Sequence, residues 1–348
     1  MFTSNLAHKR AAALIAAVAL AVSLSACQSG VPSGEGSSDG GEGDLVVGSV
    51  LYGVDGYQTA HGAAMEEYGE SIGVTVRTCN SKNEVSTQNK CMQDLVAAGV
   101  DAIVLQPIDP AAATAMVKQA QEAGIAVITW AVGPVPDVEV PFVDLAEYDQ
   151  AFEAGATAAK WVKDNLGQSP LIVDLGVPKN TNCENRETGF IDGATDADPA
   201  TKVVAQPNGG GARVVSQEAM SDIIQSGVEF NIVTGCNGES TIGGLLALQA
   251  AGRGLAVDKV PVSEYLFSVD GTSAEIELLL DPTSPLMQTL ALAPKDNVKV
   301  LLDGAVALAK GEVDNSWEAH LKDTFVEPDC ASANAFLEDQ YGTSVDCK

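Results

Sequence analysis

Amide, carboxylate, guanidinium and aromatic side chains follow a series of short apolar runs in this 348-residue sequence. Amides, carboxylates and an arginine can satisfy hydroxyl groups, which both donate and accept hydrogen bonds. Aromatic rings can cover the C–H face of a sugar ring. The combination predicts a site for a small, neutral, polyhydroxylated solute. The candidate contacts are Tyr52, Asp55, Tyr57, Gln58, Gln106, Asp109, Trp130, Asn182, Arg186, Asn237, Glu239 and Asp270.

Signals for catalysis, metals and cofactors are weak. No nucleophile–base pair is evident around His61 or His320, and the cysteines lack zinc-like spacing. No complete dinucleotide or P-loop glycine pattern occurs, and the G-x-S-x-G match at residues 36–40 lacks a flanking strand and helix. We therefore expect no cofactor, no metal and no enzyme activity. Paired carboxylates leave an exported carbohydrate-active enzyme as an alternative.

Apolar runs alternate with amphipathic segments from residue 44 onward. Strands are expected at 45–51, 74–78, 101–105, 125–130, 171–175, 202–206, 230–234, 260–269 and 285–292. Helices are expected at 56–72, 84–98, 110–123, 147–166, 185–195, 214–227, 239–251 and 297–310. This alternation predicts parallel sheets with right-handed crossovers. These strand–helix units are more numerous than one ordinary sheet contains. We therefore expect an α/β fold of two doubly wound, Rossmann-like lobes with a cleft between them.

The chain is strongly acidic. It contains 19 Lys and Arg against 47 Asp and Glu, a net charge of −28. Such a surface repels phosphate backbones and anionic lipid headgroups, so we expect no nucleic-acid partner.

The amino terminus has the features of a bacterial lipoprotein signal. Lys9 and Arg10 precede an apolar run, and the segment Leu24-Ser25-Ala26-Cys27 is similar to a lipobox. We expect residues 1–26 to be removed and Cys27 to be lipidated. Residues 27–43 are rich in Gly and Ser and would form a tether. The predicted location is the outer face of the cytoplasmic membrane, or the periplasm, with a lipid anchor.

Six further cysteines would then lie in an oxidising compartment, where they favour disulfides over metal binding. Six cysteines allow 15 pairings. Local sequence context favours Cys79–Cys91, Cys183–Cys236 and Cys330–Cys347.

Four motifs together resemble one family. The tract 99–110, GVDAIVLQPIDP, looks like the third-strand signature of periplasmic ribose-binding-type (type I) proteins. The segment 185–190, NRETGF, resembles their arginine loop. Asn237-Gly238-Glu239 and Val269-Asp270-Gly271 resemble two further loops. The resemblance spans about residues 44–326, and the order and spacing of the motifs are more specific than any one of them.

The resemblance implies a substrate-binding lipoprotein of an ABC importer that closes over a sugar and works with permease subunits, as a monomer. It implies ligand contacts from Arg186, Asn237 and Asp270. It also implies one lobe at 44–144 plus 293–322 and a second at 145–292 plus 323–348.

Three usual sugar contacts of the family are altered. Ala131-Val132 replaces an Asp-Arg pair, Tyr57 is offset from the aromatic pair, and Leu292 replaces a glutamine. The solute is therefore expected to be either a monosaccharide or a polyol. A ligand-presenting sensor subunit is a second alternative function, since its lobes would be the same. Export and the lack of a DNA-binding headpiece argue against a LacI-type repressor.

Overall fold

The computed structural model describes residues 45–145, 147–321 and 323–347. The predicted signal peptide, the tether up to residue 43 and the lipidation site Cys27 lie outside the described residues. In the part of the chain that is described, no helix is both long enough and apolar enough to cross a bilayer.

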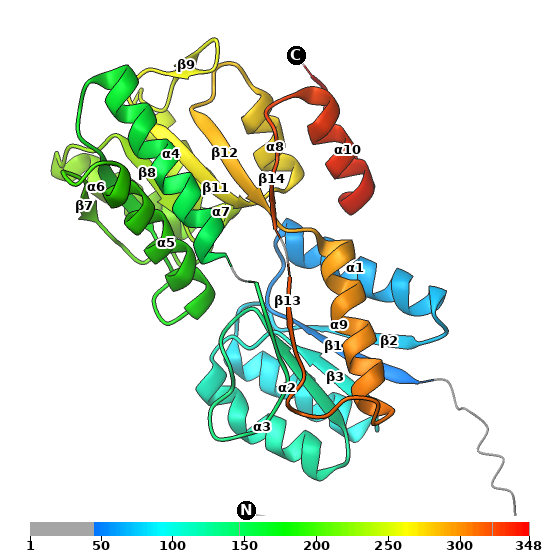
Figure 1. The fold of residues 1–348 in the computed structure, drawn as a ribbon. Helices are drawn as coiled ribbons and strands as arrows, with labels where there is room; N and C mark the ends of the chain where they lie inside the picture. Colours follow the sequence, from blue (N-terminus) through cyan, green and yellow to red (C-terminus); the bar gives the residue numbers. More distant parts are fainter. Residues whose placement is uncertain (1–44, 146, 322, 348) are drawn as a thin grey trace, which may run out of the picture. The chain divides into compact units, whose positions relative to one another are not determined.

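The first sheet has the strand order β13-β5-β4-β3-β1-β2, and every neighbouring pair is parallel (Figure 1). Its strands are β1 (Val46–Leu51), β2 (Thr75–Asn80), β3 (Ala102–Leu105), β4 (Ala126–Trp130), β5 (Phe142–Asp144) and β13 (Glu318–His320). Its helices are α1 (Gly56–Ser71), α2 (Val85–Ala97), α3 (Pro110–Glu122) and α9 (Pro294–Ala309). Helices α1 and α9 pack together, as do α2 and α3, and the two pairs cover opposite faces of the sheet.

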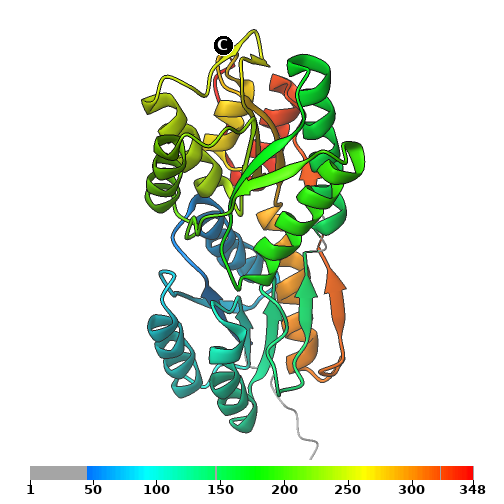
Figure 2. The same cartoon turned by 90° about the vertical axis from the view of Figure 1, so that its left-hand side faces the viewer.

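The second sheet has the order β14-β12-β11-β8-β6-β7 and is parallel except for β14. Its strands are β6 (Leu171–Leu175), β7 (Lys202–Ala205), β8 (Ile232–Gly235), β11 (Tyr265–Asp270), β12 (Leu286–Ala291) and β14 (Thr324–Phe325). Its helices are α4 (Tyr148–Leu166), α5 (Thr181–Ala197), α6 (Arg213–Ser226), α7 (Gly238–Ala250), α8 (Ser273–Leu280) and α10 (Cys330–Tyr341), seen from another side in Figure 2.

Helices α4 and α5 pack closely because glycines lie where they meet. A Cβ atom on Gly155 would lie 1.9 Å from the carbonyl oxygen of Phe190, and one on Gly193 would lie 1.9 Å from that of Phe152. These contacts hold the middle of α5 against α4, and the first turns of α5 carry part of the candidate site.

Three short segments carry the chain between the first sheet with its helices and the second sheet with its helices. They lie between β5 and α4, between β12 and α9, and between β13 and β14. Leu145, Leu292 and Leu321, one from each segment, are buried in a single apolar cluster that also contains Tyr57 and Phe267. These three leucines are therefore packed into a core that continues from one sheet to the other.

The sequence pattern predicted most elements near their observed positions, with some errors. The expected strand 260–269 is two strands, because β10 (Val260–Pro261) forms an antiparallel hairpin with β9 (Ala256–Val257) before β11 begins. Between them, buried Glu264 accepts hydrogen bonds from Arg253 and Gly254. Helix α5 begins at Thr181 and not at 185, because the Asn180 side chain caps it. The short strands β5, β9, β13 and β14 and helix α10 are not predicted by the sequence pattern, since they are brief or lie beyond the alternating segments.

Candidate functional site

Loops at the carboxyl ends of strands from both sheets line one cavity of about 70 Å³. A cavity of this size suits a small solute. Nine of the twelve candidate contacts line it: Tyr52, Asp55, Tyr57, Gln58, Gln106, Trp130, Asn182, Arg186 and Asn237. Parallel strands bring their carboxyl ends to one edge of a sheet, which explains why these residues converge.

On the side of the first sheet, the site is ordered by hydrogen bonds around Gln58. Asp55 is the N-cap of α1 and accepts a hydrogen bond from the Gln58 backbone N–H at 2.8 Å. The Gln58 side chain donates to Gln106 Oε1 at 2.7 Å and accepts from the Tyr52 backbone N–H at 3.2 Å. These bonds connect the residues that follow β1 and β3 into one polar wall.

On the side of the second sheet, two asparagine caps hold the wall. Asn180 caps α5 by accepting from the backbone N–H groups of Asn182 and Cys183 at 3.1 and 3.2 Å. Asn237 caps α7 by accepting from Ser240 at 2.9 Å, and its amide donates to the Gly211 carbonyl at 3.1 Å. The Asn182 side chain lines the cavity beside them.

Arg186 is buried and forms a two-pronged ion pair with Glu147. Its Nη2 donates to Glu147 Oε1 at 2.6 Å, its Nε donates to Oε2, and its Nη1 donates to the Cys236 carbonyl oxygen at 2.6 Å. Burial alone would lower the pKa of Arg186, but the Glu147 carboxylate holds that pKa above its usual value. Two of the five guanidinium N–H bonds have no hydrogen-bond partner among the described residues.

Asp270 lies behind this pair and does not line the cavity. It is buried at the end of β11 with φ of 115° and accepts a weak hydrogen bond from the Gly238 backbone N–H at 3.3 Å. Burial, with the like charge of Glu275, raises the pKa of Asp270 well above its usual range, although Arg186 opposes this. Asp270 is thus set apart from the nine candidates that line the cavity, and its ligand contact stays a prediction.

Two other candidates lie outside the cavity. Asp109 is exposed and caps α3 through hydrogen bonds from Ala111 and Ala112. The Glu239 carboxylate is paired with Arg213, at 2.6 Å from Nη2. Both carboxylates are occupied by local partners.

The cavity also contains residues absent from the candidate set. Asn83 follows β2 and Asn180 follows β6, so a uniform search of strand ends would have included both. Glu147, the ion-pair partner of Arg186, does not itself line the cavity. It follows β5, whose three residues gave no strand signal. Val132 and Leu292, which replace polar contacts of the ribose-binding type, add apolar surface to the wall.

The disulfides of the structure are Cys79–Cys91, Cys183–Cys236 and Cys330–Cys347. Cys183 and Cys236 both line the cavity. Their bond connects the start of α5 to the loop after β8, which are the two places that supply Asn182 and Asn237.

His61 lies behind the aromatic wall of the cavity. It is 1% exposed, and neither ring nitrogen has a hydrogen-bond partner among the described residues. Its ring stacks on that of Trp130, with centroids 4.7 Å apart. Burial lowers the pKa of His61 to about 3.

Burial of neutral His61 makes stability depend on pH. The unfolded chain binds this proton near pH 6.5, whereas the folded chain does so only near pH 3, so acidification favours unfolding. His61→Phe retains a ring against Trp130 and removes the titration. We expect urea unfolding to show that this variant gains about 2 kcal/mol relative to wild type between pH 7.5 and 5. His320→Phe, at an exposed histidine, is the matched control. The prediction would be wrong if the difference in free energy of unfolding between His61→Phe and wild type were the same at pH 7.5 and pH 5.

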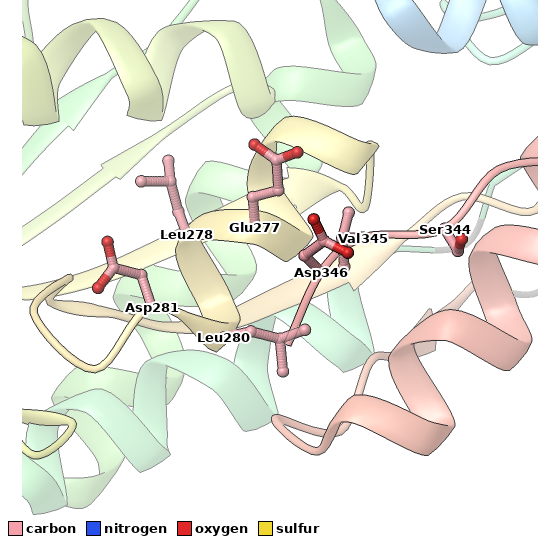
Figure 3. A pocket seen from close by; sticks show the side chains of 7 residues that line it. All are labelled: Glu277, Leu278, Leu280, Asp281, Ser344, Val345 and Asp346. Carbon is pink, nitrogen blue, oxygen red and sulfur yellow. The ribbon is translucent and has the colours of Figure 1, made fainter. Parts of the chain in front are cut away.

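A larger hollow of about 480 Å³ lies between the end of α8 and the carboxyl-terminal residues (Figure 3). Its polar side chains are Glu277, Asp281, Ser344 and Asp346. Carboxylates only accept hydrogen bonds when ionised, so this wall offers few donors to a hydroxyl-rich solute. The cavity at the strand ends therefore remains the candidate site.

This protein has two doubly wound lobes and a cavity lined by amide, charged and aromatic side chains. These features are those of the class of solute-binding proteins. The family model described as "Periplasmic binding protein domain" matches residues 47–312. The chain belongs to this family, which confirms the predicted fold class, the resemblance and the expectation of a binding protein and not an enzyme. Membership also implies a location outside the cytoplasm.

Curated relatives include three solute-binding proteins. A putative rhizopine-binding protein of Rhizobium meliloti is 29% identical over 71% of this chain and 79% of that protein. The ribose import binding protein of Bacillus subtilis is 26% identical over 56% and 61%, and a xylitol-binding protein of Mycolicibacterium smegmatis is 29% identical over 60% and 58%. The chain thus spans less than two thirds of the latter two.

Solved structures share the fold. A solute-binding protein of Bacillus halodurans with bound myo-inositol has a TM-score of 0.70 and 22% identity, over 83% of this chain and 96% of that one. A galactofuranose-binding protein has a TM-score of 0.72 and 22% identity, over 86% and 99%.

Proposed function

We propose that this protein captures a small polyhydroxylated solute, a monosaccharide or a polyol, and delivers it unchanged to the permease subunits of an ABC importer. The observation that carries the proposal is the convergence of nine strand-end residues on one small cavity. The relatives support it, because their names give ribose, xylitol and rhizopine as what they bind.

The cavity offers the groups that such a solute needs. Asn83, Asn182 and Gln106 present amides, which both donate and accept hydrogen bonds. Arg186 adds two N–H donors, and the rings of Tyr52 and Trp130 add apolar area. A solute enclosed among them would exchange its hydration for hydrogen bonds of similar number.

A panel of pentoses, hexoses, pentitols and inositols, screened by thermal unfolding and then by calorimetry, tests this function. A solute at 100 times its Kd should stabilise the native state by about 2.7 kcal/mol. The solute should be recovered chemically unchanged. Failure of the whole panel to bind, or conversion of a solute, would overturn the proposal.

Asn182→Ala tests the position of the site. The described residues form no hydrogen bond with the side-chain amide of Asn182, whose backbone N–H alone is bonded to Asn180, so removal of the side-chain amide should disturb the fold little. We expect about tenfold weaker binding, since one or two hydrogen bonds to the solute are lost. Asn165→Ala, at the exposed end of α4, is the matched control. Equal affinities of the two variants would place the solute elsewhere.

We also propose that the protein acts as a monomer held to the outer face of the membrane by lipid on Cys27. The lipobox-like segment that ends at Cys27 supports the anchor. Cys27→Ser should move the protein from the membrane fraction of the producing cell to the soluble fraction. Retention in the membrane fraction would refute the anchor, and a dimer mass in light scattering would refute the monomer.

A further inference from the structure

Among the described residues, Arg186 is the only cationic one that lines the cavity, and its charge is already neutralised. Its guanidinium group is paired with Glu147, whose side chain has no exposed area. The pair therefore contributes N–H donors to the cavity but no net positive charge. An anionic solute, such as a sugar acid or a sugar phosphate, would find no free cation in the wall.

Carboxyl groups, in contrast, are in excess of cationic groups in and around the cavity. Asp55 lines the cavity, and the ion pairs formed by the described residues do not include it. Asp270 and Asp323 lie near Arg186, and both oxygens of Asp323 are buried without a hydrogen-bond partner in the described chain. Burial raises the pKa of all three carboxyls. Each would be stabilised in its ionised form by a cation nearby.

Aromatic rings line the same cavity as Asp55. Tyr52, Tyr57 and Trp130 contribute to its wall, and the ring centroids of Tyr57 and Trp130 are 6.5 Å apart. Aromatic faces attract ammonium groups through the ring quadrupole, most strongly where water is excluded. Asp55 and these rings therefore border one small space, which is a setting that suits an ammonium group.

We propose that the solute carries a protonated amine as well as hydroxyl groups: an amino sugar or an amino polyol. The ammonium group binds Asp55 among the rings of Tyr52, Tyr57 and Trp130, while the amides and Arg186 bind the hydroxyls. This refines the neutral solute that the sequence predicted, and it rests on the proposed function, since it concerns the same cavity. The net charge of −28 would also draw a cation toward the protein.

The test compares solutes that differ only in an amine replacing a hydroxyl. Calorimetry at pH 7.0 would use 2-amino-2-deoxyhexoses against hexoses, aminocyclitols against inositols and aminopentitols against pentitols. In a pair that binds, we expect the amine to bind about tenfold or more tightly than the hydroxyl compound, and more weakly as salt is added.

The variant Asp55→Asn tests whether the Asp55 carboxylate binds the ammonium group of the solute. Asparagine caps a helix as well as aspartate does, so α1 is retained. We expect the ratio of amine to hydroxyl affinity to fall toward one in this variant. Asp109→Asn is the matched control, because Asp109 caps α3 in the same way outside the cavity, and it should keep the wild-type ratio.

The outcomes separate the two proposals. A hydroxyl compound that binds as tightly as its amine would overturn the amine assignment and leave the proposed function standing. An amine preference that survives Asp55→Asn would overturn the role of Asp55 and with it this inference. A failure of both members of every pair to bind would overturn the proposed function as well.

Discussion

Replacing Arg186 by methionine is expected to lower the free energy of unfolding by about 3–5 kcal/mol. The substitution leaves Glu147 buried, with no exposed side-chain area and no cation to balance its charge. It also removes the donor that holds the Cys236 carbonyl. Urea unfolding monitored by circular dichroism measures the loss.

Two further variants show whether charge is the cause. Arg186→Met combined with Glu147→Gln should be more stable than Arg186→Met alone, because the unpaired charge is gone. Arg213→Met breaks a partly exposed pair with Glu239 and should cost less than about 1 kcal/mol. Equal losses for Arg186→Met and Arg213→Met would show that burial of the first pair has no energetic consequence.

The Arg186→Met variant should also lose affinity for the solute, by about 2–4 kcal/mol. Arg186 lines the cavity, so the substitution removes the N–H donors that we propose to bind the solute and leaves its hydroxyls unpaired. Calorimetry at a temperature where the variant is fully folded separates this effect from the loss of stability. If the variant bound the solute as tightly as wild type does, Arg186 would not be a ligand contact.

The second large effect is expected from the Cys183–Cys236 disulfide. Its cysteines are 53 residues apart, so the loop-entropy model gives a loss of about 4 kcal/mol when both are replaced by alanine. Because Cys183 and Cys236 line the cavity and the Cys236 carbonyl orients Arg186, the solute should also bind more weakly.

The Cys79–Cys91 disulfide is the matched control. It closes a 12-residue separation, for which the same model gives about 3 kcal/mol, and neither cysteine lines the cavity. Its double alanine variant should lose stability and keep wild-type affinity. If the two double variants bound the solute equally well, the coupling of the Cys183–Cys236 bond to the site would be disproved.

The sequence predicted the strand ends well, because a buried strand and an amphipathic helix are local patterns of apolar residues. Once β1 and β3 are recognised as parallel, the residues that follow them must lie at one edge of the first sheet. The same holds for β6 and β8 in the second sheet. This reasoning reached Gln58, Gln106, Asn182 and Asn237 without knowledge of the fold's coordinates.

Pairing between charges, in contrast, was decided by tertiary structure alone. Glu147 lies 39 residues from Arg186, and the three-residue strand before it is too short to give a periodic signal. Likewise, nothing local distinguishes Asp55 in the cavity from Asp109 outside it, since both cap a helix after a strand. Electrostatic energies depend on distance and burial in three dimensions, so the sequence determined the fold and most of the wall, whereas only the folded chain determined the balance of charge.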